Sequence, residues 1–313
     1  MADTLLAIKV QNLVKRYDHK NVIDDVDFEV EEGEFYALMG PNGSGKTTLT
    51  SIIASVRLST SGSVKIFGRP PDKAKELIAY VPQDNFSSSY LTGRENLMYF
   101  AGLLGYPKKE AKKIVWEILE KLDLTKDADK KVSAYSGGMR KKLEIGTALF
   151  PSIKLFILDE PTTGVDPSGR REFLGMLNGL RKDGLTILMT THIGADAEVA
   201  SRVGLMDKGK IIAEGEPEEL KKKVGLLSVV NIETSIKSKR IADELAHFNG
   251  GKMPLESETG YRIFSEEAAS ATPDIVRTLE GLGCKVMKIE AANPTLEDVF
   301  FRLTEKSLRG GEG

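Results

Sequence analysis

The chain has 313 residues, of which 41% are hydrophobic and 29% are charged. This composition is typical of a folded globular protein and excludes a disordered one, and the length suffices for one large domain and one small domain. Lys and Arg (44) nearly balance Asp and Glu (46), which gives a formal net charge of -2. A nucleic-acid-binding surface is normally basic, so we expect no nucleic-acid partner.

The chain carries no sign of export or of membrane insertion. Cys284 is its only cysteine, so an intramolecular disulfide is excluded and a reducing compartment is expected. The first ten residues, MADTLLAIKV, lack the basic leader and the apolar run of a secretory signal. The most apolar stretches are far shorter than the roughly 20 residues that cross a bilayer. We therefore expect a cytoplasmic protein that reaches a membrane only by binding another chain.

Two kinds of strand pattern occupy the first two thirds of the chain. Ile8–Val14 and Val22–Val30 alternate apolar and polar residues, which predicts a half-exposed antiparallel sheet. Uninterrupted apolar strands follow, separated by helical patterns, and they indicate an α/β core whose sheet is covered on both faces. These strands are expected at Phe35–Met39, Ile78–Val81, Leu155–Leu158, Thr186–Met189 and Val203–Asp207.

The remaining patterns predict a helical subdomain and a second domain. Arg94–Leu149 is almost wholly helical in pattern, which predicts a helical subdomain over about residues 86–150. Charged residues before Gly225 place the domain boundary there, giving domains 1–225 and 226–313. The second reads strand, helix, strand, strand, helix, strand, the βαββαβ order of a small α+β, ferredoxin-like fold. Thr295 is expected to cap a last helix.

A glycine-rich loop follows the strand Phe35–Met39. It reads GPNGSGKT and fits G-x-x-x-x-G-K-[ST], the phosphate-binding loop of ATPases (P-loop, or Walker A). Glycines let several backbone amides point at one anion, and the following helix adds its positive N-terminal end. Lys46 is predicted to bridge the β- and γ-phosphates, and the Thr47 hydroxyl to bind Mg²⁺. The expected nucleotide-binding residues are Gly40, Asn42, Gly43, Ser44, Gly45, Lys46, Thr47 and Thr48.

Two adjacent acids end the strand Leu155–Leu158. Successive side chains diverge at the end of a strand, so Asp159 and Glu160 can take different tasks. Asp159 is predicted to hold Mg²⁺, usually through water, and Glu160 to position or deprotonate the water that attacks the γ-phosphate. The alternative, a pair of solvated acids in a loop, is disfavoured because a tight turn and a further helix follow at once.

Together, the order of these motifs resembles the ATP-binding subunits of ATP-binding-cassette (ABC) transporters over about residues 8–220. The most specific piece is Tyr135-Ser136-Gly137-Gly138-Met139, which other P-loop ATPases lack. Physically, Ser-Gly-Gly at a helix start makes a second anion site of free amides and a hydroxyl. The resemblance implies that this site closes over the γ-phosphate held by an opposite subunit. The chain would then be half of a head-to-tail dimer that encloses two ATP molecules.

The resemblance assigns four further residues one by one. Tyr17 matches the aromatic residue that stacks on adenine, and Gln83 the glutamine that reaches Mg²⁺ and the attacking water and couples to the membrane partner. Asp166 matches the aspartate that contacts the phosphate loop of the opposite subunit, as Ser136, Gly137 and Gly138 would contact its nucleotide. His192 matches the histidine that contacts the γ-phosphate. The implied catalytic set is Glu160, His192 and Gln83, the implied metal set Thr47, Gln83 and Asp159, and the cofactors ATP and Mg²⁺.

Departures from the common family pattern point to one branch. Tyr135 and Met139 replace the usual Leu and Gln, and basic Arg140-Lys141-Lys142 follows. These features, with the ending Asn293–Phe300 (NPTLEDVF), resemble drug exporters of the daunorubicin-resistance type. The resemblance implies two partners, a second cassette (identical or homologous) and an integral membrane permease that holds the chain at the inner face of the membrane.

Several readings stay open in the sequence. A soluble ABC ATPase that acts on DNA or ribosomes would carry a long coiled-coil insertion or two cassettes, and neither pattern occurs here. An importer ATPase is a further alternative, although those of the sugar type carry longer C-terminal regions. The second domain could sense a ligand or could stabilise the dimer, and the fold alone is a weak argument for either. The cargo and the preference for ATP over GTP are not encoded in these motifs.

Overall fold

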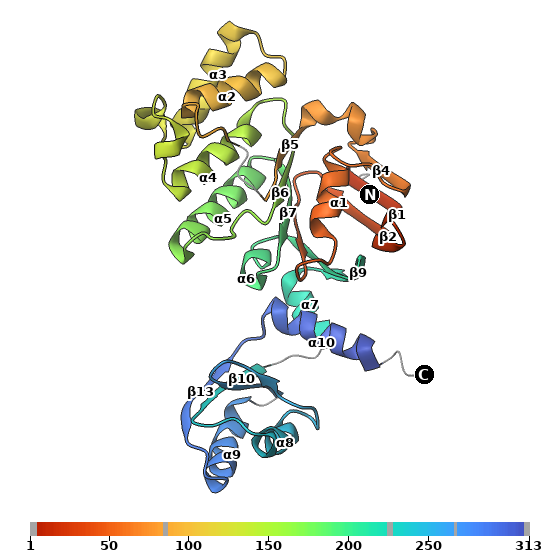
Figure 1. Cartoon of the computed structure of the whole chain (residues 1–313), viewed down its shortest axis with the longest axis vertical. Coiled ribbons are helices and arrows are strands. Elements are labelled where there is room, and N and C mark those ends of the chain that lie inside the picture. The colour runs from red at the N-terminus through yellow and green to blue at the C-terminus, as the bar shows by residue number, and fades with distance from the viewer. Residues whose placement is uncertain (1–4, 84–86, 224–227, 266–267, 310–313) are drawn as a thin grey trace. The chain divides into compact units, whose positions relative to one another are not determined.

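The computed structural model describes residues 5–83, 87–223, 228–265 and 268–309 (Figure 1). They form two compact units, Met1–Glu216 and Pro217–Gly313. The sequence placed the boundary after residue 225, beyond helix α7 (Pro217–Lys223). Helix α7 packs against α10 (Leu296–Arg309), however, and its contacts therefore assign it to the second unit. None of the helices in the described ranges is long and apolar enough to cross a membrane.

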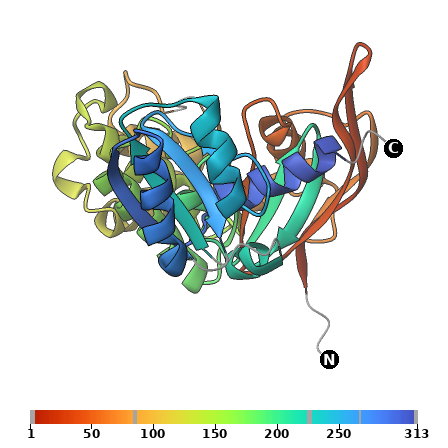
Figure 2. The same cartoon turned by 90° about the horizontal axis from the view of Figure 1, so that it is seen from below.

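The first unit begins with the predicted antiparallel sheet. Strands β1 (Leu6–Tyr17) and β2 (Lys20–Glu31) form a long twisted ribbon, drawn in red in Figure 2. Strand β4 (Ser61–Ile66) pairs with the other edge of β1 and gives the order β2-β1-β4. The sequence did not predict β4, because this edge strand buries only Ile66 and so lacks an alternating apolar pattern.

A six-stranded sheet forms the centre of the first unit, in the order β5-β6-β7-β3-β8-β9. All neighbours are parallel except β8 and β9. Five of its strands are largely apolar because both faces of the sheet are covered. Their bounds are β3 (Phe35–Met39), β5 (Ile78–Val81), β6 (Leu155–Asp159), β7 (Thr186–Thr191) and β8 (Arg202–Asp207). The sixth strand, β9 (Lys210–Gly215), is partly exposed and was not predicted.

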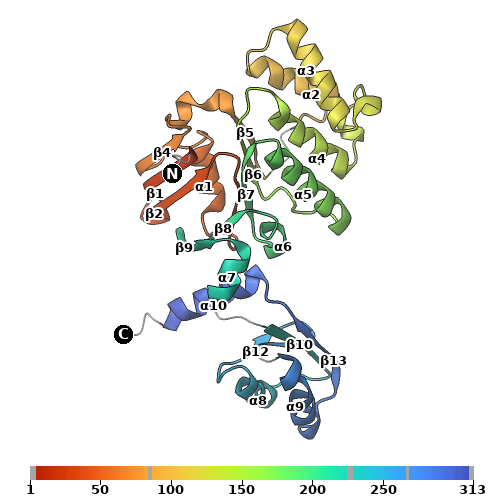
Figure 3. The same cartoon turned by 180° about the vertical axis from the view of Figure 1, so that it is seen from behind.

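Helices cover both faces of this sheet. Helix α1 (Lys46–Ile53) lies on one face with the three-stranded sheet, while α4 (Gly137–Gly146) and α5 (Pro167–Lys182) lie on the other, as Figures 1 and 3 show from opposite sides. The sequence extended α1 to about residue 56, but the helix ends three residues earlier. The carboxyl ends of β3, β6 and β7 lie side by side, which is where ligands bind in sheets of this kind.

The helical subdomain comprises α2 (Gly93–Leu103), α3 (Lys108–Lys121) and α4. Helix α2 starts at a capping box, in which the Thr92 hydroxyl accepts the Glu95 amide and the Glu95 carboxylate accepts the Thr92 amide. Short 3₁₀ turns at Thr125–Asp127, Val132–Ala134 and Thr147–Leu149 connect and extend these helices. The helical segment expected over residues 94–149 is therefore present.

The second unit has the predicted βαββαβ order. Its strands pair in the order β11-β12-β10-β13 and every neighbouring pair is antiparallel. Helices α8 and α9 pack on one face of this sheet (Figure 3) around a core that includes Ile232, Leu245 and Leu279. The bounds are β10 (Ser228–Thr234), α8 (Lys239–Phe248), β11 (Leu255–Glu256), β12 (Gly260–Ser265), α9 (Ala268–Gly281) and β13 (Val286–Ala292).

The C-terminal motif fixes the start of α10 to strand β12. The Asp298 carboxylate, 2% exposed, accepts hydrogen bonds from the Thr295 amide (2.7 Å) and hydroxyl (2.8 Å). The same carboxylate forms an ion pair with Arg262 of β12 at 2.7 Å. Leu296 and Val299 are fully buried on the same side of the helix. The motif that resembles drug exporters thus has a structural task inside the second unit.

Asn249 is expected to be a critical residue for the stability of the second unit. Its side chain, 2% exposed, donates to the carbonyls of Lys252 and Met253 (3.0 Å each) and accepts the amide of Phe264 (2.7 Å). Asn249→Ala removes these three buried hydrogen bonds and should destabilise the unit by about 2 kcal/mol or more. Hydrogen exchange would show faster exchange across β12, whereas the control Asn231→Ala should leave it unchanged.

Candidate nucleotide-binding and hydrolysis site

The phosphate loop connects β3 to α1, and close packing dictates its glycines. Gly43 and Gly45 have positive φ angles of 82° and 112°, which side chains rarely allow. A Cβ at Gly45 would lie 2.7 Å from the carbonyl oxygen of Val22, and one at Gly40 would lie 2.1 Å from that of Met206. The loop is thus pressed against β2 and β8, and only glycine fits at these positions.

Lys46 lies inside the curled loop. Its Nζ atom donates to the carbonyl oxygens of Gly40 (2.8 Å) and Pro41 (3.1 Å) and lies 3.2 Å from Oε1 of Glu160. Only 3% of the lysine side chain is exposed. The loop therefore holds one cation in a fixed place beneath the amides at the start of α1, which together form an anion-binding arrangement.

Glu160 lies between that cation and His192. Its second oxygen, Oε2, is 3.1 Å from Nδ1 of His192, and 7% of its side chain is exposed. Its backbone has a left-handed φ of 46°, which is strained for a residue with a side chain. Thr190 holds this conformation, because its carbonyl (3.2 Å) and hydroxyl (3.0 Å) oxygens both accept the Glu160 amide. This backbone conformation directs the carboxylate toward Lys46 and His192.

Asp159 lies deeper than Glu160 and is 1% exposed. The Thr190 hydroxyl donates to its Oδ1 atom at 2.6 Å. Burial raises the pKa of Asp159 above its ordinary value, while hydrogen bonds from Thr190 and Thr47 oppose the rise. A carboxylate that is costly to bury alone is a favourable partner for a cation. Thr190 thus organises both acids, and no signal in the sequence marked it for this role.

A cavity of about 350 Å³ opens over the loop. It is lined by Val22, Asn42, Gly43, Gly45, Lys46, Thr47, Thr48, Gln83 and Glu160. The structure therefore brings together most of the predicted loop residues with Gln83 and Glu160, which are distant in sequence, and adds Val22. Ser44 Oγ is buried without a hydrogen-bond partner among the described residues, so this hydroxyl is available to a phosphate oxygen.

The residues assigned to the opposite subunit lie elsewhere on the first unit. Ser136 caps α4, its hydroxyl accepting the Met139 amide at 3.2 Å, and Gly137 and Gly138 are exposed beside it. Asp166 caps α5, its carboxylate accepting the amides of Ser168 and Gly169 at 3.1 Å each. The cavity over the loop is lined by neither group. Each is a solvent-facing helix start.

Tyr17 is also outside the cavity lining. Its ring is 39% exposed, and its hydroxyl accepts a hydrogen bond from Arg57 at 2.7 Å. Lys15 Nζ lies 4.9 Å from the ring centroid. These two cations hold the ring in place, and the sequence gave no signal for Arg57.

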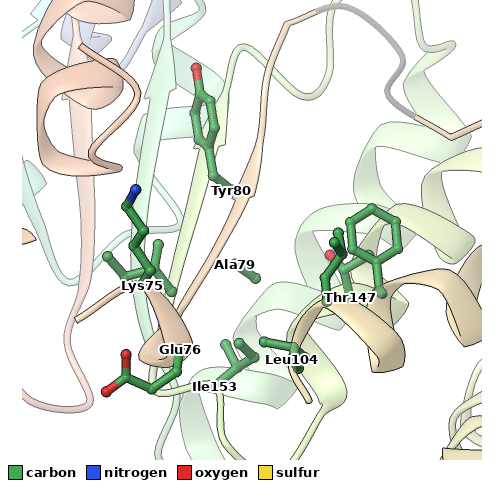
Figure 4. A pocket seen from close by; sticks show the side chains of 10 residues that line it. Lys75, Glu76, Ala79, Tyr80, Leu104, Thr147 and Ile153 are labelled. Carbon is green, nitrogen blue, oxygen red and sulfur yellow. The ribbon is translucent and has the colours of Figure 1, made fainter. Parts of the chain in front are cut away.

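An apolar groove lies between the sheet and the helical subdomain (Figure 4). Its volume is about 450 Å³, and β5, which forms one wall, ends two residues before Gln83. Leu103 of α2 lines the groove and is 65% exposed. The other lining residues are Lys75, Glu76, Ile78, Ala79, Tyr80, Phe100, Leu104, Thr147 and Ile153.

A strand, a glycine loop around a buried lysine, and a second strand of the same parallel sheet with two acids at its end define a P-loop nucleoside triphosphatase. Residues 23–163 match the ABC transporter family. The chain is 34% identical over 307 residues to the daunorubicin resistance ATP-binding protein DrrA2 of Streptomyces coeruleorubidus, covering 95% of each chain. It is 35% identical over 308 residues to the Nod factor export ATP-binding protein I of Burkholderia thailandensis, covering 96% of this chain and 98% of that protein.

A solved structure gives the same result. It is the dimeric structure of an ATP-binding cassette in a post-hydrolysis state, bound to ADP and phosphate. That cassette is 26% identical to this chain with a TM-score of 0.61, and the match covers 67% of this chain and 98% of that one. The chain therefore belongs to the ATP-binding subunits of ABC transporters. It binds and hydrolyses ATP, and the predicted fold of the cassette is confirmed.

Proposed function

We propose that this chain powers a membrane exporter, in which ATP closes a dimer of cassettes and hydrolysis reopens it. The observation that carries the dimer is the separation of two anion-binding features, the phosphate loop with its cavity and the exposed helix start at Ser136. Each feature is half of a site. The direction of transport rests on the relatives named for daunorubicin resistance and Nod factor export, whose similarity covers at least 95% of this chain.

Within one chain, the phosphate loop binds the triphosphate and Glu160 acts on water. A γ-phosphate near Lys46 Nζ competes with Glu160, which lies 3.2 Å from that atom. Glu160 keeps its contact with His192, and its carboxylate is then free to orient the attacking water and accept its proton. Gln83 completes this side of the cavity, and Tyr17 would stack on the base.

The residues at the loop also fit Mg²⁺. Thr47 and Asp159 offer a hydroxyl and a buried carboxylate, and Gln83 an amide oxygen, while the remaining ligands of this cation normally come from phosphates and water. When bound, the cation would neutralise charge on the phosphates. Thr190 orients Asp159 for this task through the 2.6 Å hydrogen bond.

In the closed dimer, the residues at the helix starts would act on the opposite subunit. Ser136, Gly137 and Gly138 supply amides and a hydroxyl for the γ-phosphate held by the partner cassette. Asp166 would contact the phosphate loop of that cassette. The second cassette is either another copy of this chain or a homologous chain.

The membrane permease is proposed to dock in the groove beside Gln83. The groove is apolar, and β5, which forms one wall, leads directly to Gln83 in the lining of the nucleotide cavity. Movement of a segment bound in the groove would therefore be transmitted to the nucleotide cavity. A permease segment with apolar side chains fits this surface. Such docking would place the chain at the inner face of the membrane.

Leu103→Glu should release the chain from membranes that contain its permease. The substitution puts a charge on the apolar wall of the groove, and its burial on docking costs several kcal/mol. The membrane-bound fraction in a sedimentation assay should fall at least tenfold, while ATP binding by the purified chain is unchanged. Leu58→Glu is the matched control, because Leu58 is 84% exposed and is not among the groove residues. Equal release by both variants would contradict docking at the groove.

A further inference from the structure

The loop that follows Glu160 and the short helix that follows His192 are joined by a buried hydrogen bond. The Thr162 hydroxyl donates to Oδ2 of Asp196, which lies in α6 (Gly194–Ala197). Thr162 is 2% exposed and Asp196 is 0% exposed. Arg170 of α5 approaches the other carboxylate oxygen, with its Nε atom 3.7 Å from Oδ1. The sequence marked neither Thr162 nor Asp196 as a functional position.

Hydrogen bonds flank the contact between Glu160 and His192 on both sides. On one side, Thr190 binds the Asp159 carboxylate and the Glu160 amide. On the other side, Thr162, two residues after Glu160, donates to Asp196, four residues after His192. The 3.1 Å contact between Glu160 Oε2 and His192 Nδ1 therefore lies between two fixed points.

We propose that Asp196 and Thr162 are positioning residues for hydrolysis, which keep the Glu160 carboxylate and the His192 ring in contact. The Asp196 carboxylate is fully buried, and burial of a charge is costly and is normally offset by close partners. Its partners here are a hydroxyl on the loop after Glu160 and a guanidinium on α5. Neither Thr162 nor Asp196 lines the nucleotide cavity, so they act through Glu160, which does, and through its contact with His192.

The consequence should be a loss of rate without a loss of nucleotide affinity. Glu160 sits on a strained backbone, and a loop freed at Thr162 lets that strain relax and the carboxylate move. A displacement of about 1 Å in a reacting group can cost roughly a hundredfold in rate. The phosphate loop and Tyr17 keep their own contacts, so ATP binding should change little.

The test uses the full-length chain with Thr162→Val, which keeps the shape of the side chain and removes the hydroxyl. We expect kcat for ATP hydrolysis to fall by about ten- to a hundredfold, with KM for ATP within about threefold of wild type. Thr162→Ser retains the hydroxyl and should keep kcat within about threefold. If Thr162→Val does not fold, the double variant Thr162→Val/Asp196→Asn also lacks the bond but leaves no unpaired buried carboxylate, and the same fall is expected.

A double-mutant cycle distinguishes positioning from general stability. In a His192→Ala background, Thr162→Val should lower the residual rate far less than it does in the wild type, because the contact that it aligns is already lost. An unchanged kcat in folded Thr162→Val, or an equal fall in Thr162→Ser, would overturn the proposal.

The inference rests on the proposed roles of Glu160 and His192, and the two can fail separately. If Glu160→Gln hydrolyses ATP at the wild-type rate, the proposed function of the site is wrong. If Glu160→Gln is inactive but Thr162→Val is fully active, only the positioning role is wrong.

Discussion

Glu160→Gln should lower the rate of ATP hydrolysis by about 10²- to 10⁴-fold, the range that a positioned general base contributes. Glutamine keeps the size of the side chain and can still bind water, but it cannot accept a proton. The Glu160 side chain is 7% exposed, and the backbone amide of Glu160 donates to Thr190. The substitution changes neither contact of the backbone and should not disturb the loop. Release of phosphate from ATP by the purified chain measures the effect.

The same variant should accumulate the closed dimer. ATP still binds the phosphate loop, and closure should no longer be followed by rapid hydrolysis, so light scattering with ATP should report a dimer that ADP does not produce. Glu32→Gln, at an exposed turn, is the control and should retain wild-type hydrolysis and remain monomeric after turnover. A Glu160→Gln variant that hydrolyses ATP like the control would remove Glu160 from the proposed role.

The site was predictable where a motif fixes a local backbone shape. The phosphate loop is one continuous segment, and its glycines and its lysine are required by contacts within the folded loop and with the strands beside it. The pair Asp159-Glu160 was equally visible, because it ends a strand that must be buried between β5 and β7. The other buried strands of this sheet were predictable for the same reason, whereas β4 and β9 were not, since their partial exposure removes the pattern.

Contacts between distant segments could not be read from the sequence. Thr190 and Asp196 look ordinary in the chain, yet each holds the loop around Glu160 from a different strand or helix. The same holds for Arg57, which is 40 residues from Tyr17 but donates to its hydroxyl. The groove beside Gln83 likewise combines β5 with α2, and only the folded chain brings them together.

Lys46→Met should abolish ATP binding at concentrations that saturate the wild type. The methionine fills the space of the lysine stem but removes the only cation that contacts both the loop carbonyls and Glu160 in the described structure. The variant loses the proposed charge-assisted hydrogen bonds from Lys46 to the β- and γ-phosphates, at about 1.5–3 kcal/mol each, which corresponds to at least roughly a hundredfold loss of affinity. Calorimetric titration with ATP measures it, with the exposed Lys65→Met as control.

A second measurement on Lys46→Met examines the ion pair itself. The substitution leaves the Glu160 carboxylate buried near the loop without its cation, so the unliganded chain should unfold at a lower temperature than the wild type. Adding Glu160→Gln removes the unpaired charge, and the double variant should regain part of the lost stability without regaining ATP binding. Stability effects that simply add in the double variant would show that the 3.2 Å contact contributes nothing to the fold. Recovery in the double variant would show that Lys46 and Glu160 stabilise each other until a phosphate takes the place of the carboxylate.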